Sequence, residues 1–335
     1  MAGAETIPRN RDVVVIGCSA GGVEALPRII QQLPPDLPAT VCIVQHLART
    51  ENPYLVEILR RNTRLPIDWA EQGVRSEPGR VYVAPPDMHM LFADHHLVLS
   101  RSPRENHSRP SIDKLFRSAA AIHGSRVIGV LLTGMLDDGV SGLCAIRDSG
   151  GVVVVQDPED AAFPDLPARA LLALEPDRTL PLDAIGSALL ALTAEPAPRT
   201  AIPESVVKEA RVDHLGAVPA ERMHELGPQT TTACPDCDGP LWKLGDERLR
   251  RYRCYNGHAA TAAELVAASN AQVEVALWSA VRALNDRAST LETLAADAQR
   301  LGNEQTAETY SARGREARHH AELAREFILS LGRPR

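Results

Sequence analysis

The clearest pattern in the chain is a series of short apolar runs, each of which ends in polar residues. Residues 13–16, 40–44 and 127–132 are rich in β-branched side chains, which is typical of strands buried on both faces of a sheet. Stretches with helical periodicity, such as residues 23–32 and the segment after Ser111 up to about 123, lie between these runs. This alternation predicts a doubly wound, mostly parallel α/β sheet with right-handed crossovers.

Other segments up to residue 194 extend the pattern. Ser111 is a plausible N-cap of the helix that follows it. The remaining expected elements are short strands at 66–72 and 80–84, a strand pair within 90–100, a strand at 152–156, helices at 52–62, 140–149 and 182–192, and a loop with two prolines at 157–167.

The second part of the chain has a different character. Proline, threonine and charged residues dominate up to Ala233, which indicates a linker with one short helix at 204–212. Clustered cysteines and a predicted hairpin at 241–252 follow. In the tail, two heptad seams that meet near Gly302 predict an antiparallel helical hairpin. The expected organisation is an α/β domain at 1–194, a linker at 195–233, a small module at 234–260 and a helical hairpin at 261–335.

Composition narrows the class of protein. The chain has 335 residues, 44% of them hydrophobic, which suits a globular protein of more than one domain. A net charge of -7 argues against general affinity for nucleic acid or anionic membranes. No apolar run approaches the ~20 residues that span a bilayer, and residues 1–12 lack the features of a signal peptide. We therefore expect a cytoplasmic protein with no membrane insertion.

The turn after the first apolar run carries a candidate nucleophile. Residues 17–21 fit G-x-S-x-G, a sharp strand-to-helix turn that exposes the hydroxyl of Ser19. The helix that follows would direct its free N–H groups at whatever Ser19 binds. The motif alone is equally compatible with phosphate binding or with tight packing.

Two further strand ends carry polar chemistry. His46 follows the second apolar run, and Asp137 and Asp138 follow the run at 127–132. A serine, a histidine and a carboxylate are the set that nucleophilic acyl transfer requires, because the histidine accepts the hydroxyl proton and the carboxylate fixes its tautomer. A structural role for His46 is the alternative. The chain order Ser, His, Asp differs from that of α/β-hydrolases, so the serine motif does not indicate that fold.

Several separate segments resemble the CheB-type protein-glutamate methylesterases, the chemotaxis enzymes that demethylate chemoreceptors. The resemblance covers about residues 12–192. It rests on IGCSAGG at 16–22, QH at 45–46, VYVAPPDMHM at 81–90, RPSIDKLF at 109–116 and LTGMLDDG at 132–139.

The resemblance implies a role for each candidate residue. Ser19 would be the nucleophile, His46 the general base and then acid, and Asp138, in preference to Asp137, the orienting carboxylate. The backbone N–H of Met135 would stabilise the oxyanion, together with a second donor near Ser19. The implied reaction is hydrolysis of glutamate γ-methyl esters on a chemoreceptor-like helical protein through an acyl-serine intermediate. Glutamine deamidation is the implied second activity, and neither step needs a cofactor.

The chain also departs from the family's usual pattern. Ala20 stands where a hydroxyl residue is frequent, and Pro86 stands in place of glycine, so the shape of the substrate groove is open. The typical enzyme has a receiver domain ahead of the catalytic domain. Here the first strand begins near Asp12, so we expect no attached receiver and control by the tail, by a partner or by neither.

The cysteines fall into two groups. Cys18, Cys42 and Cys144 stand singly in apolar surroundings. The others form C-x2-C-x-G followed, after a hairpin length, by C-x3-H, which supplies four ligands to one tetrahedral zinc, with Gly239 leaving room for backbone N–H groups near the thiolates. The expected ligands of this structural zinc ribbon are Cys234, Cys237, Cys254 and His258. Three unpaired thiols and an unrelated histidine are the alternative.

Partners are less constrained by the sequence. The arginines of the predicted hairpin could bind nucleic acid, or they could form a face of the hairpin that is exposed to solvent. The acidic net charge favours the solvated face, so we expect no nucleic-acid partner. They are Arg248, Arg250, Arg251 and Arg253. Arg109 admits anion binding or simple exposure. The helical tail fits a self-contained module, a dimer interface or a dock for helical receptors.

Two other functions remain open beside the methylesterase. The chain could be a diverged scaffold that binds through its zinc ribbon and helical tail, or an esterase or amidase that acts on a different, small substrate.

Overall fold

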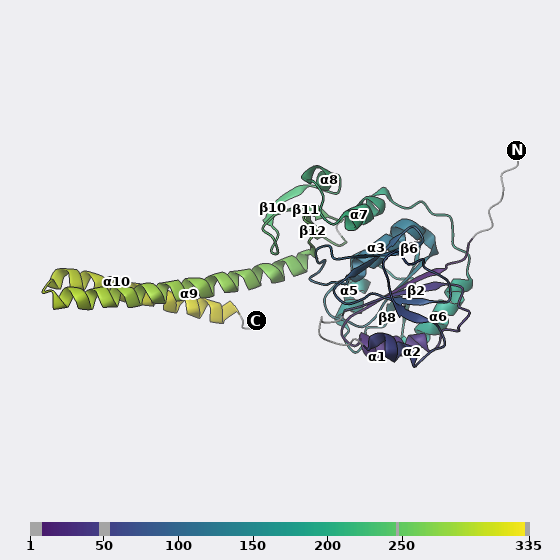
Figure 1. The fold of residues 1–335 in the computed structure, drawn as a ribbon, viewed down its shortest axis with the longest axis horizontal. Coiled ribbons are helices and arrows are strands. Elements are labelled where there is room, and N and C mark those ends of the chain that lie inside the picture. The colour runs from purple at the N-terminus through teal and green to yellow at the C-terminus, as the bar shows by residue number, and fades with distance from the viewer. Residues whose placement is uncertain (1–8, 47–53, 246–247, 332–335) are drawn as a thin grey trace. The chain divides into compact units, whose positions relative to one another are not determined.

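The structure is a computed structural model that describes residues 9–46, 54–245 and 248–331 (Figure 1). The chain forms two compact units, Met1–Glu264 and Leu265–Arg335. No helix in the described part of the chain is both long enough and apolar enough to cross a membrane.

A seven-stranded sheet lies at the centre of the first unit, and all its neighbouring strands are parallel. This confirms the predicted doubly wound α/β fold. In spatial order the strands are β3 (Ile67–Trp69), β4 (Val81–Val83), β2 (Thr40–Gln45), β1 (Val13–Cys18), β7 (Val127–Leu131), β8 (Val152–Gln156) and β9 (Arg178–Leu180).

Helices cover both faces of the sheet (Figure 1). Because side chains alternate along a strand, Val14 and Ile16 pack into one apolar cluster and Val13 and Val15 into the other. The face with Val14 and Ile16 is covered by α1 (Gly22–Ile30), α2 (Leu55–Arg60) and α6 (Leu182–Ala194). The face with Val13 and Val15 is covered by α3 (Ile112–His123), α4 (Val140–Asp148) and α5 (Asp165–Ala173). The antiparallel hairpin of β5 (His89–Ala93) and β6 (His96–Ser100) packs on this second face as well.

One local prediction differs from the structure, and one lies partly outside the described residues. Part of the expected loop at 157–167 is the first turn of α5, which begins at Asp165 with Pro167 inside that turn. Proline is tolerated there because the first N–H groups of a helix have no intrahelical partner. The helix expected at 52–62 is α2, and the start of that expectation lies outside the described residues.

The segment expected as a linker contains regular elements. Helix α7 (Glu204–Leu215) packs on α3, and α8 (Ala220–His224) and β10 (Gln229–Ala233) follow it. Strand β10 opens a four-stranded antiparallel sheet that continues with β11 (Pro240–Leu244), β12 (Arg251–Cys254) and β13 (Ala259–Thr261). The β11–β12 hairpin confirms the one predicted from the sequence.

The second unit consists of two long helices, as the heptad seams predicted. Helix α9 (Ala262–Arg300) begins at the end of the first unit, and α10 (Glu304–Leu331) returns along it. The buried seam includes Val281, Ala321 and Ile328. Val281 in the middle of α9 meets Ala321 and Ile328 in the second half of α10, whereas Gly314 earlier in α10 lies beside Ala288 and Leu291 later in α9, so the pair is antiparallel.

Candidate active site

The sheet brings the candidate residues to one edge. Strand β1 lies between β2 and β7, with Cys18 opposite Gln45 and Gly17 opposite Leu131. The chain continues past these strands into Ser19, His46 and the segment 132–139. This edge is where a doubly wound sheet reverses its strand order, which is the usual place for a binding or catalytic site.

A chain of hydrogen-bond contacts joins three of the predicted residues. His46 Nδ1 lies 3.2 Å from Ser19 Oγ, and His46 Nε2 lies 2.7 Å from Asp138 Oδ2. A carboxylate accepts a proton donor, so this geometry assigns the ring proton to Nε2 and leaves Nδ1 free to accept from the serine hydroxyl. Ser19 and His46 are partly exposed and Asp138 is buried.

Asp138 receives an unusual number of donors. Its Oδ1 accepts from Asn106 Nδ2 at 3.1 Å, Ser111 Oγ at 2.9 Å and the backbone N–H of Asp113 at 3.2 Å. Its Oδ2 accepts from the backbone N–H of Ile112 at 2.7 Å as well as from His46. The N-terminus of α3 therefore binds this carboxylate as it would bind an anion.

These donors decide the ionisation of Asp138. Burial favours the neutral acid. The hydrogen bond from His46, the electrostatic attraction of the His46 ring and the N–H of Ile112 together outweigh burial, so the pKa of Asp138 lies below its usual range. The neighbouring Asp113 shows the opposite behaviour, since burial and the charge of Asp138 raise its pKa. The pKa values of these two neighbouring buried carboxyls are thus shifted in opposite directions.

Gln45 fixes the backbone on both sides of the candidate pair. Its Nε2 donates to the carbonyl of Ser19 at 2.7 Å and to that of His46 at 2.9 Å, while its Oε1 accepts from Cys18 Sγ. Thr133 adds a third tie, because its carbonyl accepts from the N–H of Ser19 at 3.0 Å. The QH motif pointed to this position, but nothing in the sequence indicated that the glutamine acts as a brace.

Glycine allows the close approach of the loop after β7 to the serine. A Cβ at Gly134 would lie 2.9 Å from Ser19 Cβ and 2.7 Å from Leu166 Cδ2. Real Cβ atoms do not approach this closely, so any other residue at this position would push the loop away from Ser19. The loop thereby places the backbone of Met135 near the serine.

The backbone N–H of Met135 is available for a hydrogen bond. The Met135 side chain is half exposed, and among the described residues nothing accepts a hydrogen bond from its backbone N–H. Leu136 follows with a positive φ of 65°, which gives this short loop a bent path between β7 and Asp138. The N-terminal turn of α1 directs further N–H groups to the same edge.

Two other polar residues near the candidate site take a structural role. Arg109 donates to Asp87 Oδ1 from two nitrogens and to the carbonyls of Arg101 and Ser102, so its guanidinium is bound within the protein rather than open to an anion. A second structural residue is His89. Its ring bonds both the carbonyl of Pro103 and the N–H of Ser111, and burial lowers the pKa of His89 to about 3.

The Cys3His group comes together as predicted. One ligand atom from each of Cys234, Cys237, Cys254 and His258 lies within 4.8 Å of all the others. The Cys237 and Cys254 sulfurs are 3.7 Å apart, and Cys254 Sγ is 3.6 Å from His258 Nδ1. Tetrahedral zinc with Zn–S bonds of 2.3 Å separates two sulfurs by ~3.8 Å, so these residues fit the metal.

The arginines next to this group correct one expectation. Arg251 and Arg253 are buried, and each binds a carboxylate of α7: Arg251 binds Glu209 and Arg253 binds Asp213. The expectation that the hairpin arginines form a solvated face is therefore wrong for these two. Alternation along β12 turns both side chains toward α7, a contact that the sequence did not indicate.

Comparisons with known proteins concern the α/β domain. The family model of the CheB methylesterases matches residues 14–189. The chain belongs to the CheB methylesterase family. The match covers the sheet and its helices. The small module at residues 234–260 that contains the Cys3His group, called the Cys3His module below, and the helical hairpin lie outside the match.

Two relatives and one solved structure show how far the similarity to the CheB family extends. Protein-glutamate methylesterase/protein-glutamine glutaminase 2 of Anaeromyxobacter dehalogenans is 41% identical over 182 residues, 54% of this chain and 53% of that protein. A putative enzyme of the same name in Leptospira interrogans is 38% identical over 184 residues, 55% of this chain and 95% of that protein. The crystal structure of the Thermotoga maritima CheB methylesterase catalytic domain superposes with a TM-score of 0.53 at 34% identity, covering 54% of this chain and 98% of that one.

The chain spans about half the length of several curated relatives, for example 53% of one and 55% of another. The similarity therefore concerns the α/β domain, and what the rest of each protein does is a separate question.

Proposed function

We propose that this CheB-family protein is a serine hydrolase that removes the methyl group from glutamate γ-methyl esters of a chemoreceptor-like helical protein. The observation that carries the proposal is the contact chain from Ser19 Oγ through the His46 ring to Asp138. The relatives' names give the substrate class and add deamidation of glutamine side chains as a second activity.

In the proposed acylation step, His46 Nδ1 takes the proton from Ser19 Oγ while that oxygen attacks the ester carbonyl carbon. The charge that develops on the carbonyl oxygen is stabilised by the N–H of Met135 and by N–H groups at the start of α1. The proton on Nδ1 then passes to the departing methoxide, which leaves as methanol. Asp138 accepts from Nε2–H throughout and stabilises the imidazolium.

Deacylation uses the same groups in reverse. A water molecule gives a proton to His46 Nδ1 as its oxygen attacks the acyl carbon, and the proton returns to Ser19 Oγ when that bond breaks. The products are the free glutamate carboxylate and the restored serine. A glutamine substrate follows the same path with ammonia as the leaving group.

The decisive experiment measures methanol released from a methylated receptor by the purified full chain. We expect Ser19→Ala to lower kcat by on the order of 10⁵-fold or more, as loss of a triad serine does elsewhere. Ser187→Ala on the exposed side of α6 is the matched control and should keep full activity. Equal methanol release by Ser19→Ala and the parent would show that this serine is not the nucleophile. Labelling of Ser19 by a fluorophosphonate without receptor activity would favour a different, small substrate.

We further propose that the Cys3His group holds a structural zinc. All four positions of a tetrahedral ion would be filled by protein ligands, which leaves none for substrate. The backbone N–H groups of Asp236 and Cys237 bond to the Cys234 sulfur and favour its thiolate, while the hydrogen bond with Cys254 and burial act in the opposite direction and raise the pKa of Cys234. Metal analysis of the purified chain should find about one zinc per chain, and zinc-free protein with a folded module would overturn the assignment.

A further inference from the structure

A tight turn at residues 105–108 lies beside the candidate active site. Ser108 N–H donates to the carbonyl of Glu105 at 3.0 Å, and Glu105 N–H donates to the carbonyl of Ser108 at 3.4 Å. The two central residues, Asn106 and His107, have φ values of 51° and 57°. Two successive positive φ angles are typical of a type I′ turn, whose conformation is narrowly defined. The position of the Asn106 side chain is therefore set by what holds this turn.

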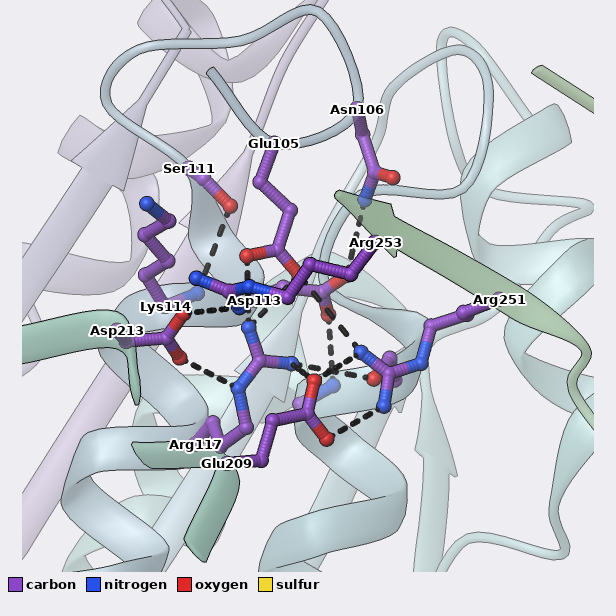
Figure 2. A network of polar contacts seen from close by, with 12 residues as sticks. Glu105, Asn106, Ser111, Asp113, Lys114, Arg117, Glu209, Asp213, Arg251 and Arg253 are labelled. Atoms are coloured by element: carbon purple, nitrogen blue, oxygen red, sulfur yellow. Dashed lines mark hydrogen bonds and ion pairs between the residues drawn. The ribbon is translucent and has the colours of Figure 1, made fainter. Parts of the chain in front are cut away.

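The side chain of Asn106 joins the two buried carboxyls of the site. Its Nδ2 donates to Asp138 Oδ1 at 3.1 Å and to Asp113 Oδ2 at 2.9 Å, and Figure 2 shows the amide reaching toward Asp113 from the turn. Asp113 Oδ1 in turn accepts from the N–H of Gly139, the residue after Asp138. One amide group therefore fixes the acidic end of the Ser19–His46–Asp138 chain from two directions.

The turn is held by the Cys3His module. Asn106 N–H donates to the carbonyl of Ala259 at 2.8 Å, and Ala259 N–H donates to the carbonyl of Arg104 at 3.4 Å. Ala259 begins β13 and directly follows His258, whose carbonyl accepts from the N–H of Cys254 at 2.9 Å. Two of the four expected metal ligands thus bracket the short turn that presents Ala259 to Asn106.

A buried ionic network makes a second connection between the module and this turn (Figure 2). Arg117 of α3 donates from one nitrogen to both carboxylate oxygens of Glu105, at 2.7 Å each, and from Nε to Asp213 of α7 at 2.7 Å. Asp213 also accepts from Arg253 of β12 at 2.6 Å. Glu105 is therefore fixed through its side chain by the same strand that ends in Cys254.

We propose that Asn106 is a positioning residue for Asp138, and that the metal-bound turn at 254–258 keeps Asn106 in place. The inference rests on the proposed esterase function. Metal in the Cys3His group then controls the rate of the chemical step without touching substrate. The module becomes part of the catalytic apparatus of this chain, although it lies outside the region that matches the family.

The first test removes the amide and keeps the turn. Asn106→Gly permits the positive φ and retains the backbone bond to Ala259. We expect kcat with methylated receptor to fall about tenfold, since one hydrogen bond to a charged group is lost, with KM unchanged. Fluorophosphonate labelling of Ser19 should slow by a similar factor. His107→Gly, the other positive-φ position of the turn, has an exposed side chain and should keep the parent's kcat.

The second test removes the metal from the full chain with a chelator. We expect the kcat of the metal-free parent to fall toward that of metal-loaded Asn106→Gly. Removal of the metal from Asn106→Gly should lower its kcat little further, because metal removal and the substitution both disrupt the same contact between Asn106 and Asp138. Hydrogen exchange of the amides of residues 104–113 should accelerate on metal removal while that of β1 does not.

Either of two results would overturn the inference: parent-like kcat in Asn106→Gly, or an equal fold-loss on chelation in the parent and the variant. A loaded parent that neither releases methanol nor labels at Ser19 would instead overturn the proposed function. In that case the hydrogen-exchange measurement still tests the structural part of the inference. If the amides of residues 104–113 exchange at the same rate with and without metal, the module does not keep the turn in place.

Discussion

The α/β sheet and the Cys3His module are stabilised in different ways. The sheet lies between two large apolar clusters, one on each face. The apolar core around the module consists of Val212, Val218, Met223 and Trp242, with Leu226 packed against it. An apolar core of that size contributes little, so the module depends on its ligand residues for stability.

This difference explains where chemistry is possible. Apolar burial holds the sheet together, so the polar residues at its strand ends can be arranged for reaction rather than for stability. The ion pair of Arg253 in β12 with Asp213 in α7 is completely buried. Because burying charges is costly, such pairs specify a geometry more than they add stability. The module therefore acts as a support for a site that belongs to the sheet.

Loss of a metal ligand should have the largest effect, and it should affect the Cys3His module but not the α/β sheet. We expect Cys254→Ser to abolish stoichiometric zinc and to accelerate amide exchange throughout β10–β13, since binding of structural zinc contributes on the order of 10 kcal/mol to folding of small zinc modules. Exchange in β1 and β2 should stay slow. Cys144→Ser on α4 is the matched control and should retain zinc. A module that exchanges as slowly in Cys254→Ser as in the parent would contradict the comparison.

Asp138→Asn should have the largest effect on the chemistry. The amide cannot accept as a carboxylate does, so the His46 ring is expected to turn to the wrong tautomer and kcat to fall by on the order of 10⁴-fold with the fold intact. Circular dichroism checks the fold, and methanol release measures kcat. Asp137→Asn alters the adjacent carboxyl, and a loss as large as that of Asp138→Asn would reverse the assignment of the orienting residue.

Arg117→Met should destabilise the first unit by about 3–5 kcal/mol, because it leaves the buried carboxylates of Glu105 and Asp213 without their shared cation. Denaturant unfolding followed by far-UV circular dichroism measures the change. Arg28→Met breaks an exposed pair with Asp183, which solvent screens, and should change stability far less. Equal costs for the two variants would mean that the network is not buried in solution.

Most of the fold follows from the sequence, because the apolar runs of the sheet and the heptad seams of the tail have strong periodicity. The candidate site residues at strand ends were predictable for the same reason: parallel strands bring their carboxyl ends together. The Cys and His spacing was a third local signal. Each of these features is visible within a short window of sequence.

The support of the site was not predictable in this way. Asn106 lies just before the RPSIDKLF segment and makes its contacts across long sequence separations, to Asp138 and to Ala259. Arg251 and Arg253 looked like solvated residues because their partners lie in α7, about 40 residues earlier in a segment of irregular composition. Long-range polar pairs leave no periodic pattern. Only the position of Asn106 next to a matching motif could have drawn attention to it.

The smallest effect concerns Glu264, a buried carboxyl in the first turn of α9. Its N–H and side chain form a capping box with Thr261, and burial together with the charges of Asp137 and Asp138 raises the pKa of Glu264 to about 9. Between its ordinary pKa and this value, the folded protein holds a proton that the unfolded chain releases. Stability should therefore fall by up to about 1.4 kcal/mol per pH unit as the pH rises through this window.

Glu264→Gln cannot ionise, so it should flatten this part of the pH profile, and its stability advantage over the parent should grow between about pH 6 and about pH 8. Denaturant unfolding across that range measures it, with the exposed Glu57→Gln as control. A difference between variant and parent that does not change with pH would show that the carboxyl is ionised in the folded state. The charge beside Asp137 would then be one that the start of α9 imposes on the site at every pH near neutrality.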